Sequence, residues 1–143
     1  STPSWTRSFL AVLAGGITGV ATTLGTDHTL TTWHLGWFGT GGRAETPGAL
    51  ALLLSYGLGA AVLAGYVTGW VARTCEIRHA LAMGVLQLAM GTAAIIAYFE
   101  VAPAWYHVTV LALLLPAHVF GGWVRAQQRR RLLVNAHALK TLL

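Results

Sequence analysis

The chain has 143 residues, of which 55% are hydrophobic and 9% are charged, and its formal net charge is +5. A typical soluble domain carries about 25% charged residues, so this chain has too little charge to cover a water-exposed surface. Its single cysteine, Cys75, excludes an intramolecular disulfide framework. The basic residues flank apolar segments, which predicts a lipid bilayer and not a nucleic acid as the partner. The composition therefore predicts an all-α membrane protein.

The first predicted span covers residues 8–26 and is long enough to cross ~30 Å of hydrocarbon. Small residues recur at every fourth position of this span: Ala11, Gly15, Gly19 and Thr23. On a helix this spacing places them in one row, which lets a second helix approach closely.

A long polar connection follows over residues 27–47, and its aromatic side chains predict an interfacial loop at the level of the lipid headgroups. Imidazoles and carboxylates can bind zinc or copper, so one candidate metal site combines this loop with the start of the fourth span. Its members are Asp27, His28, His34 and His107. No HxxxH or HExxH spacing is present, and histidines that only meet headgroups are the commoner case.

The second predicted span, residues 48–72, carries a row of small residues spaced four apart: Gly57, Ala61, Gly65 and Gly69. The other faces of this helix carry Leu, Val and aromatic side chains. Such a row is typical of small-xxx-small packing between membrane helices. We expect its last two glycines to face Gly15 and Gly19 across the first hairpin.

Two further spans are predicted over residues 79–99 and 104–124, and residues 129–143 have the apolar spacing of an amphipathic surface helix. With both termini in the cytoplasm, every Lys and Arg except Arg43 lies on the inner side, as the positive-inside rule requires. The sequence therefore predicts one membrane domain over residues 1–143. We expect a four-helix up-down bundle in the bacterial inner membrane.

Four polar side chains fall in one predicted layer when depth is counted from the inner charges at about 1.5 Å per residue: Thr18, Tyr66, Gln87 and His118. Because neighbouring helices of a hairpin meet at equal depth, we expect Gln87 and His118 to lie within hydrogen-bonding distance. The layer has two interpretations. Its hydrogen bonds hold the helices in register, or it lines a pocket for a small ligand, a quinone headgroup or a permeating solute.

All four carboxylates are expected at or outside the membrane surface: Asp27, Glu45, Glu76 and Glu100. The lack of a carboxylate within the membrane disfavours proton-coupled transport. Neither a Walker A loop nor a GxSxG motif is present, so no catalytic residue and no cofactor are assigned.

The stretches AGYVTGWVARTCEIRHALAMGVLQL and PAWYHVTVLALLLPAHVFGGWVRAQQRRR together resemble a loose group of uncharacterised bacterial four-helix inner-membrane proteins. The shared features are a Gly-rich second helix that ends in an Ala-Arg turn, an outer Pro-x-Trp-Tyr-His motif and an inner Gly-Gly before basic residues. In this chain they correspond to Gly65–Arg73, Pro103–His107 and Gly121–Arg125. The resemblance covers the second to fourth spans and implies a fold and a location, but no activity.

Two functions are consistent with these features. The first is a non-enzymatic bundle that self-associates or serves as a small accessory subunit of a larger membrane complex. The second is an oligomeric channel or transporter for a small solute or ion, which would use the polar layer. A dry core with a large apolar lateral surface would favour the first function, and a continuous polar path would favour the second.

Overall fold

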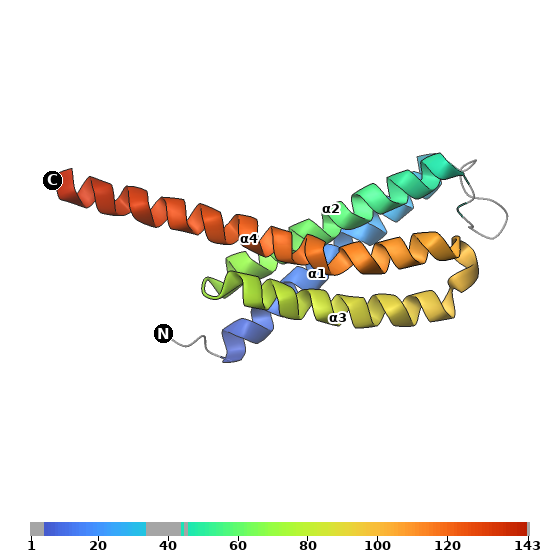
Figure 1. Cartoon of the computed structure of the whole chain (residues 1–143), viewed down its shortest axis with the longest axis horizontal. Helices are drawn as coiled ribbons and strands as arrows, with labels where there is room; N and C mark the ends of the chain where they lie inside the picture. The colour runs from blue at the N-terminus through green and yellow to red at the C-terminus, as the bar shows by residue number, and fades with distance from the viewer. Residues whose placement is uncertain (1–4, 34–43, 45, 143) are drawn as a thin grey trace.

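The structure is a computed structural model of the chain, and it describes residues 5–33, 44 and 46–142 (Figure 1). The described residues form four long helices and one short 3₁₀ helix. These are α1 (Trp5–Trp33), α2 (Pro47–Ala72), α3 (Glu76–Ala97), η2 (Phe99–Val101) and α4 (Ala104–Leu142). Each of the four long helices is long and apolar enough to cross a membrane.

Helix α1 is longer than the predicted span over residues 8–26, because it continues to Trp33. Two threonines in this extension donate their hydroxyl protons to carbonyls one turn back: Thr29 to Gly25 at 2.8 Å and Thr32 to His28 at 2.7 Å. These bonds satisfy the hydroxyl groups within the helix itself, and no proline interrupts the extension. The first part of the predicted interfacial loop is therefore helical, and residues 34–43 and 45 lie outside the described residues.

Helix α2 agrees with the predicted span, and its two ends have local causes in the sequence. Thr46 is the N-cap, and its hydroxyl accepts a hydrogen bond from the Ala49 amide at 3.3 Å while Pro47 occupies the first turn. At the other end Arg73 adopts a left-handed conformation with φ of 59°, and its amide donates to the Gly69 carbonyl at 3.2 Å.

Helix α4 corrects the predicted C-terminal surface helix. It is one continuous helix of 39 residues that includes residues 129–142, so the tail is not a separate element. After Gly122 the sequence contains neither Gly nor Pro, and its Ala, Gln, Arg and Leu residues are good helix formers. Pro116 lies within α4 without ending it. In Figure 1 the C-terminal part of α4 extends well beyond the other helices.

Helices α2 and α4 pack backbone against backbone, with glycines of both helices at the contact. A Cβ atom on Gly65 would overlap the His118 carbonyl oxygen and lie 2.8 Å from the His118 carbonyl carbon. In return, a Cβ atom on Gly121 would overlap the Val62 carbonyl oxygen and lie 2.7 Å from the Tyr66 amide nitrogen. The small residues therefore allow the close approach that the sequence predicts, and Gly65 makes this approach with α4.

The expected pairing of glycines across the first hairpin is wrong. A Cβ atom on Gly15 would collide with Thr68, and one on Gly19 would lie 3.3 Å from Cβ of Ala64. Ala64 and Thr68 each precede a glycine of the predicted row, so α2 presents them to α1 on the adjacent face and turns Gly65 toward α4. Of the rest of the row, Ala61 is buried, Gly69 lies between Glu76 of α3 and Arg125 of α4, and Gly57 has open space around it.

Polar contacts join all four helices at one end of the molecule, which we call the basic end and define by Arg7, Arg73 and Arg129. The Arg7 Nε–H donates to the Val71 carbonyl at 3.1 Å. Arg129 donates to a Glu76 carboxylate oxygen at 2.6 Å and also to the Arg73 carbonyl. Glu76 is thus buried within the protein in an ion pair.

At the opposite end, the described residues are held together by apolar packing and by a backbone hydrogen bond. The Ala44 amide donates to the Val101 carbonyl at 3.0 Å, which ties the segment before α2 to η2. Ala44, Ala49, Leu50 and Ala102 form a buried cluster there. Toward this end the pair α1–α2 diverges from the pair α3–α4 (Figure 1).

Candidate functional site

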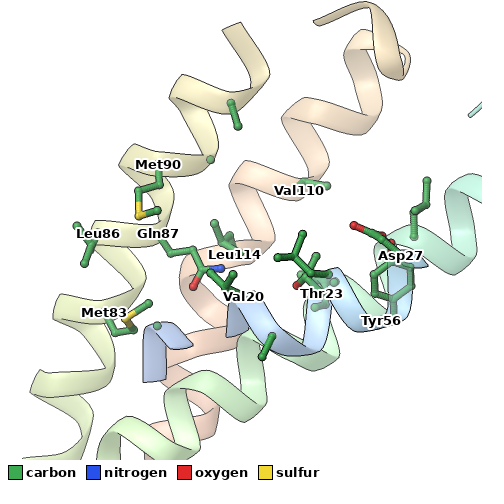
Figure 2. A pocket seen from close by; sticks show the side chains of 18 of the residues that line it. Val20, Thr23, Asp27, Tyr56, Met83, Leu86, Gln87, Met90, Val110 and Leu114 are labelled. Atoms are coloured by element: carbon green, nitrogen blue, oxygen red, sulfur yellow. The ribbon is translucent and has the colours of Figure 1, made fainter. Parts of the chain in front are cut away.

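A cavity of about 1270 Å³ lies between the four helices (Figure 2). Its wall on α1 extends from Phe9 to Asp27, which corresponds to roughly 27 Å at about 1.5 Å per residue. The lining is almost entirely aliphatic, aromatic and Met side chains. The polar and ionisable residues in it are Thr23, Asp27, Tyr56, Gln87, Tyr106 and His107. The cavity therefore offers a long apolar surface with polar groups at two levels, one at Gln87 and one near Asp27.

The predicted hydrogen bond between Gln87 and His118 is confirmed. His118 is completely buried, and its Nε2 lies 3.0 Å from Oε1 of Gln87. The other ring nitrogen, Nδ1, lies 2.8 Å from the Leu114 carbonyl. A carbonyl only accepts, so Nδ1 carries a proton, and Nε2 of a neutral imidazole is then an acceptor.

This protonation state determines how the Gln87 amide must be oriented. Two acceptors cannot form a hydrogen bond, so the pair is satisfied when Gln87 turns its NH₂ group toward Nε2 and donates. An imidazolium that donates from both nitrogens would bury a charge between two neutral acceptors, which is strongly unfavourable. The amide oxygen of Gln87, a residue that lines the cavity, is then left as a further acceptor.

Gln87 links three helices and not only two. It lies on α3, pairs with His118 of α4, and reaches α1 at Gly19, where an added Cβ atom would lie 3.5 and 3.6 Å from its two amide heteroatoms. The Gln87 amide therefore lies close to the backbone of α1 at Gly19. Figure 2 shows Gln87 at the edge of the cavity, near Val20 and Leu114.

The other two members of the predicted layer do not join this pair. The Tyr66 hydroxyl donates to Oε1 of Gln128 at 2.8 Å, and the Thr18 hydroxyl donates to the Ala14 carbonyl of its own helix at 2.8 Å. Tyr66 points to Gln128 because the continuous α4 brings this residue alongside α2.

The sequence reasoning also missed Thr68, which is completely buried on the α1 side of α2. Its position one residue before Gly69 of the small row is the signal that could have revealed it.

Asp27 occupies a different place from the predicted one. It is part of α1, within the apolar window Trp5–Leu30, and it lines the cavity. Its carboxylate accepts a hydrogen bond from the Tyr56 hydroxyl of α2. Figure 2 shows the two side chains next to each other at one side of the cavity. The expectation that this carboxylate belongs to an external loop is therefore wrong, because α1 continues past it.

The described members of the predicted metal site do not assemble into one. In the part of the chain that the structure describes, no group of three or more His, Cys, Asp or Glu side chains could hold a metal ion. His107 instead places Nε2 3.0 Å from the Phe99 carbonyl, to which it donates, and its ring lies 5.2 Å from the Phe99 ring. His34, the fourth member of the predicted site, lies outside the described residues.

Comparison with known proteins leaves the site to be interpreted from its own geometry. No protein-family model matches the chain, and no curated protein and no solved structure matches it. The cavity supplies apolar surface, one amide and one hydrogen-bonded carboxylate. These groups can bind and orient an apolar or amphiphilic partner.

Proposed function

We propose that this chain is a non-enzymatic integral membrane bundle that self-associates or serves as a small accessory subunit of a larger membrane complex. The observation that carries the proposal is the apolar lateral surface of α1 and α3. Large apolar side chains are exposed along one side of α1, among them Phe9, Leu13 and Ile17, and Val85 and Met90 are exposed on α3. Phe9, Leu13, Ile17 and Met90 also line the cavity, so this apolar surface is partly concave and helices of a partner can cover it.

The proposal includes a location and an orientation. The helices would span the bacterial inner membrane up and down, with both termini in the cytoplasm. The basic end supports this orientation, because its contacts bring Arg7, Arg73 and Arg129 to one side of the molecule. Basic residues concentrate on the cytoplasmic side of membrane proteins.

The mass of the purified protein in a mild non-ionic detergent tests the functional proposal. Size-exclusion chromatography with light scattering should give a protein mass above the 15.1 kDa of one chain, through further copies or a co-purified subunit. Single cysteines at Ile17 and Val85, in a background with Cys75→Ser, should form cross-links to that partner. A cysteine at Ala60, which is buried, is the matched control and should not. The proposal would be contradicted if the protein were a monomer in detergent and the single-cysteine variants formed no cross-links in native membranes.

A second candidate function is an oligomeric channel or transporter for a small solute or ion. One observation favours it: Gln87, paired with His118, faces the large cavity, and polar groups within membranes commonly mark solute pathways. Flux into proteoliposomes that is abolished by His118→Gln, with the fold intact, would support this function. An unchanged leak would instead favour the accessory role.

A further inference from the structure

A second, smaller cavity of about 450 Å³ lies at the basic end, between the start of α1 and the end of α2. Thr6, Arg7 and Leu10 line it from α1, and Trp70, Val71 and Arg73 line it from the other side. Two arginines, a threonine, a tryptophan and two aliphatic residues thus line one hollow. No carboxylate is among these lining residues.

The two arginines are held in place by different contacts. The Arg7 Nε–H donates to the Val71 carbonyl at 3.1 Å, which fixes this guanidinium against the last turn of α2. Arg73 is held through its backbone, because its amide donates to the Gly69 carbonyl and its carbonyl accepts from Arg129. The nearby Glu76 carboxylate is bound by Arg129 at 2.6 Å. The charge of the hollow is therefore positive.

The backbone conformation of Arg73 belongs to the turn between α2 and α3. Its φ of 59° is in the left-handed region, which favours glycine because a Cβ atom is strained there, and Cys75 has a similar φ of 51°. The turn places Arg73 at the end of α2, where it lines the hollow.

The remaining lining residues suit a lipid better than a small free anion. Trp70 and Leu10 are each about half exposed at the mouth of the hollow. Tryptophan is typical of the membrane interface, and basic pockets between membrane helices bind anionic lipid headgroups. We propose that this hollow binds the phosphate of one anionic phospholipid between Arg7 and Arg73, with the glycerol and upper acyl chains against Trp70 and Leu10.

This inference requires that the chain is embedded in a membrane, but it does not require self-association. Guanidinium groups bind phosphate through charge-assisted hydrogen bonds, which two arginines from different segments can supply together. Such a lipid would join α1 to the end of α2. It would thereby reinforce the contact that the Arg7 hydrogen bond already makes.

Native mass spectrometry of the full chain in a non-ionic detergent tests the proposal, with dioleoyl phosphatidylglycerol and dioleoyl phosphatidylcholine as the probes. We expect one phosphatidylglycerol to bind at least tenfold more tightly than phosphatidylcholine. Arg7→Gln and Arg73→Gln should each weaken phosphatidylglycerol binding about tenfold. Arg131→Gln removes the same charge outside the hollow and is the matched control, with an expected change below twofold. Equal losses for Arg73→Gln and Arg131→Gln would show general charge attraction and overturn the proposal.

Two further arms make the test specific. Arg73→Gly relieves the strain of the left-handed conformation, so the free energy of unfolding should stay the same or increase. Phosphatidylglycerol binding by this variant should fall about tenfold. Retained binding in this variant would overturn the role of the Arg73 side chain. Millimolar inorganic phosphate should not displace the lipid. Complete displacement would show a site for free anions and would overturn the lipid assignment.

Discussion

The backbone contact between α2 and α4 makes a sharp prediction about glycine substitutions within one helix. Gly65 and Gly59 both lie in the interior of α2, but their surroundings differ. A Cβ atom on Gly65 would lie 2.8 Å from the carbonyl carbon and 2.9 Å from Cα of His118, and it would overlap the carbonyl oxygen. A Cβ atom on Gly59 would meet no atom within 4 Å.

The size of the effect follows from these distances. Carbon atoms pack at about 3.5–4.0 Å, so the two helices must separate by roughly 1 Å at this point to admit a methyl group. The obstacle is backbone of α4, which cannot change rotamer to make room. Overpacking of this kind costs roughly 1–3 kcal/mol, so Gly65→Ala should destabilise by that amount and Gly65→Leu by at least as much. Gly59→Ala should be neutral or stabilise by up to about 1 kcal/mol, because alanine favours the helix.

Reversible unfolding in mixed micelles of a non-ionic detergent and SDS, followed by circular dichroism, measures both variants. The two alanine substitutions should shift the free energy of unfolding in opposite directions, or differ by at least about 1 kcal/mol. Gly121→Ala, on the other side of the same contact, should behave like Gly65→Ala. If Gly65→Ala were as stable as Gly59→Ala, the close crossing of α2 and α4 would be refuted.

Three further predictions concern polar groups and topology. His118→Gln should change the free energy of unfolding by less than about 1 kcal/mol, because an amide can still donate and accept a hydrogen bond. His118→Leu should lower it by on the order of 1 kcal/mol, because the hydrogen bond is lost. Equal stability of the two variants would argue against this bond. Glu76→Gln should destabilise by roughly 1 kcal/mol because it removes the charge that pairs with Arg129, and the loss should disappear in an Arg129→Gln background. Single cysteines at Thr40 and Gln127, in a background without the native cysteine, should be labelled by an impermeant maleimide from the periplasmic and the cytoplasmic side, respectively; labelling of position 40 from the cytoplasm would contradict the proposed orientation.

The starts of α2 and α4 and the Gln87–His118 contact could be read from the sequence, whereas α1 and α3 each begin three residues before the predicted spans. The starts of α2 and α4 follow from Thr46-Pro47 and from Pro103, which act within a few residues of the chain. The Gln87–His118 pair follows from counting residues inward from basic positions, because helices rise at a constant rate and neighbours meet at equal depth. Local chemistry and regular geometry are sufficient for both features.

The C-terminal ends of α1 and α4 could not be predicted from the sequence in the same way. Charged and polar residues after position 26 have the composition of a loop, yet the helix continues to Trp33 and includes Asp27, with the Thr29 and Thr32 hydroxyls bonded to carbonyls of the same helix. The basic residues after position 124 have the composition of a membrane boundary, but nothing in that stretch breaks a helix. The composition of a segment indicates whether water or lipid surrounds it. Where a helix ends depends instead on whether the backbone N–H and C=O groups of the next residues can still form helical hydrogen bonds.

The sequence by itself determined that the chain forms long apolar helices and which residues share a face of each one, because the period of the helix is fixed. Only the tertiary structure decided how each helix is rotated against its neighbours. On α2, adjacent faces carry Ala64 with Thr68 and Gly65 with Gly69, and both are small enough to admit another helix. The choice that places α1 on the first pair and α4 on the second depends on all four helices packing at once. Periodicity within one helix carries no information about that choice.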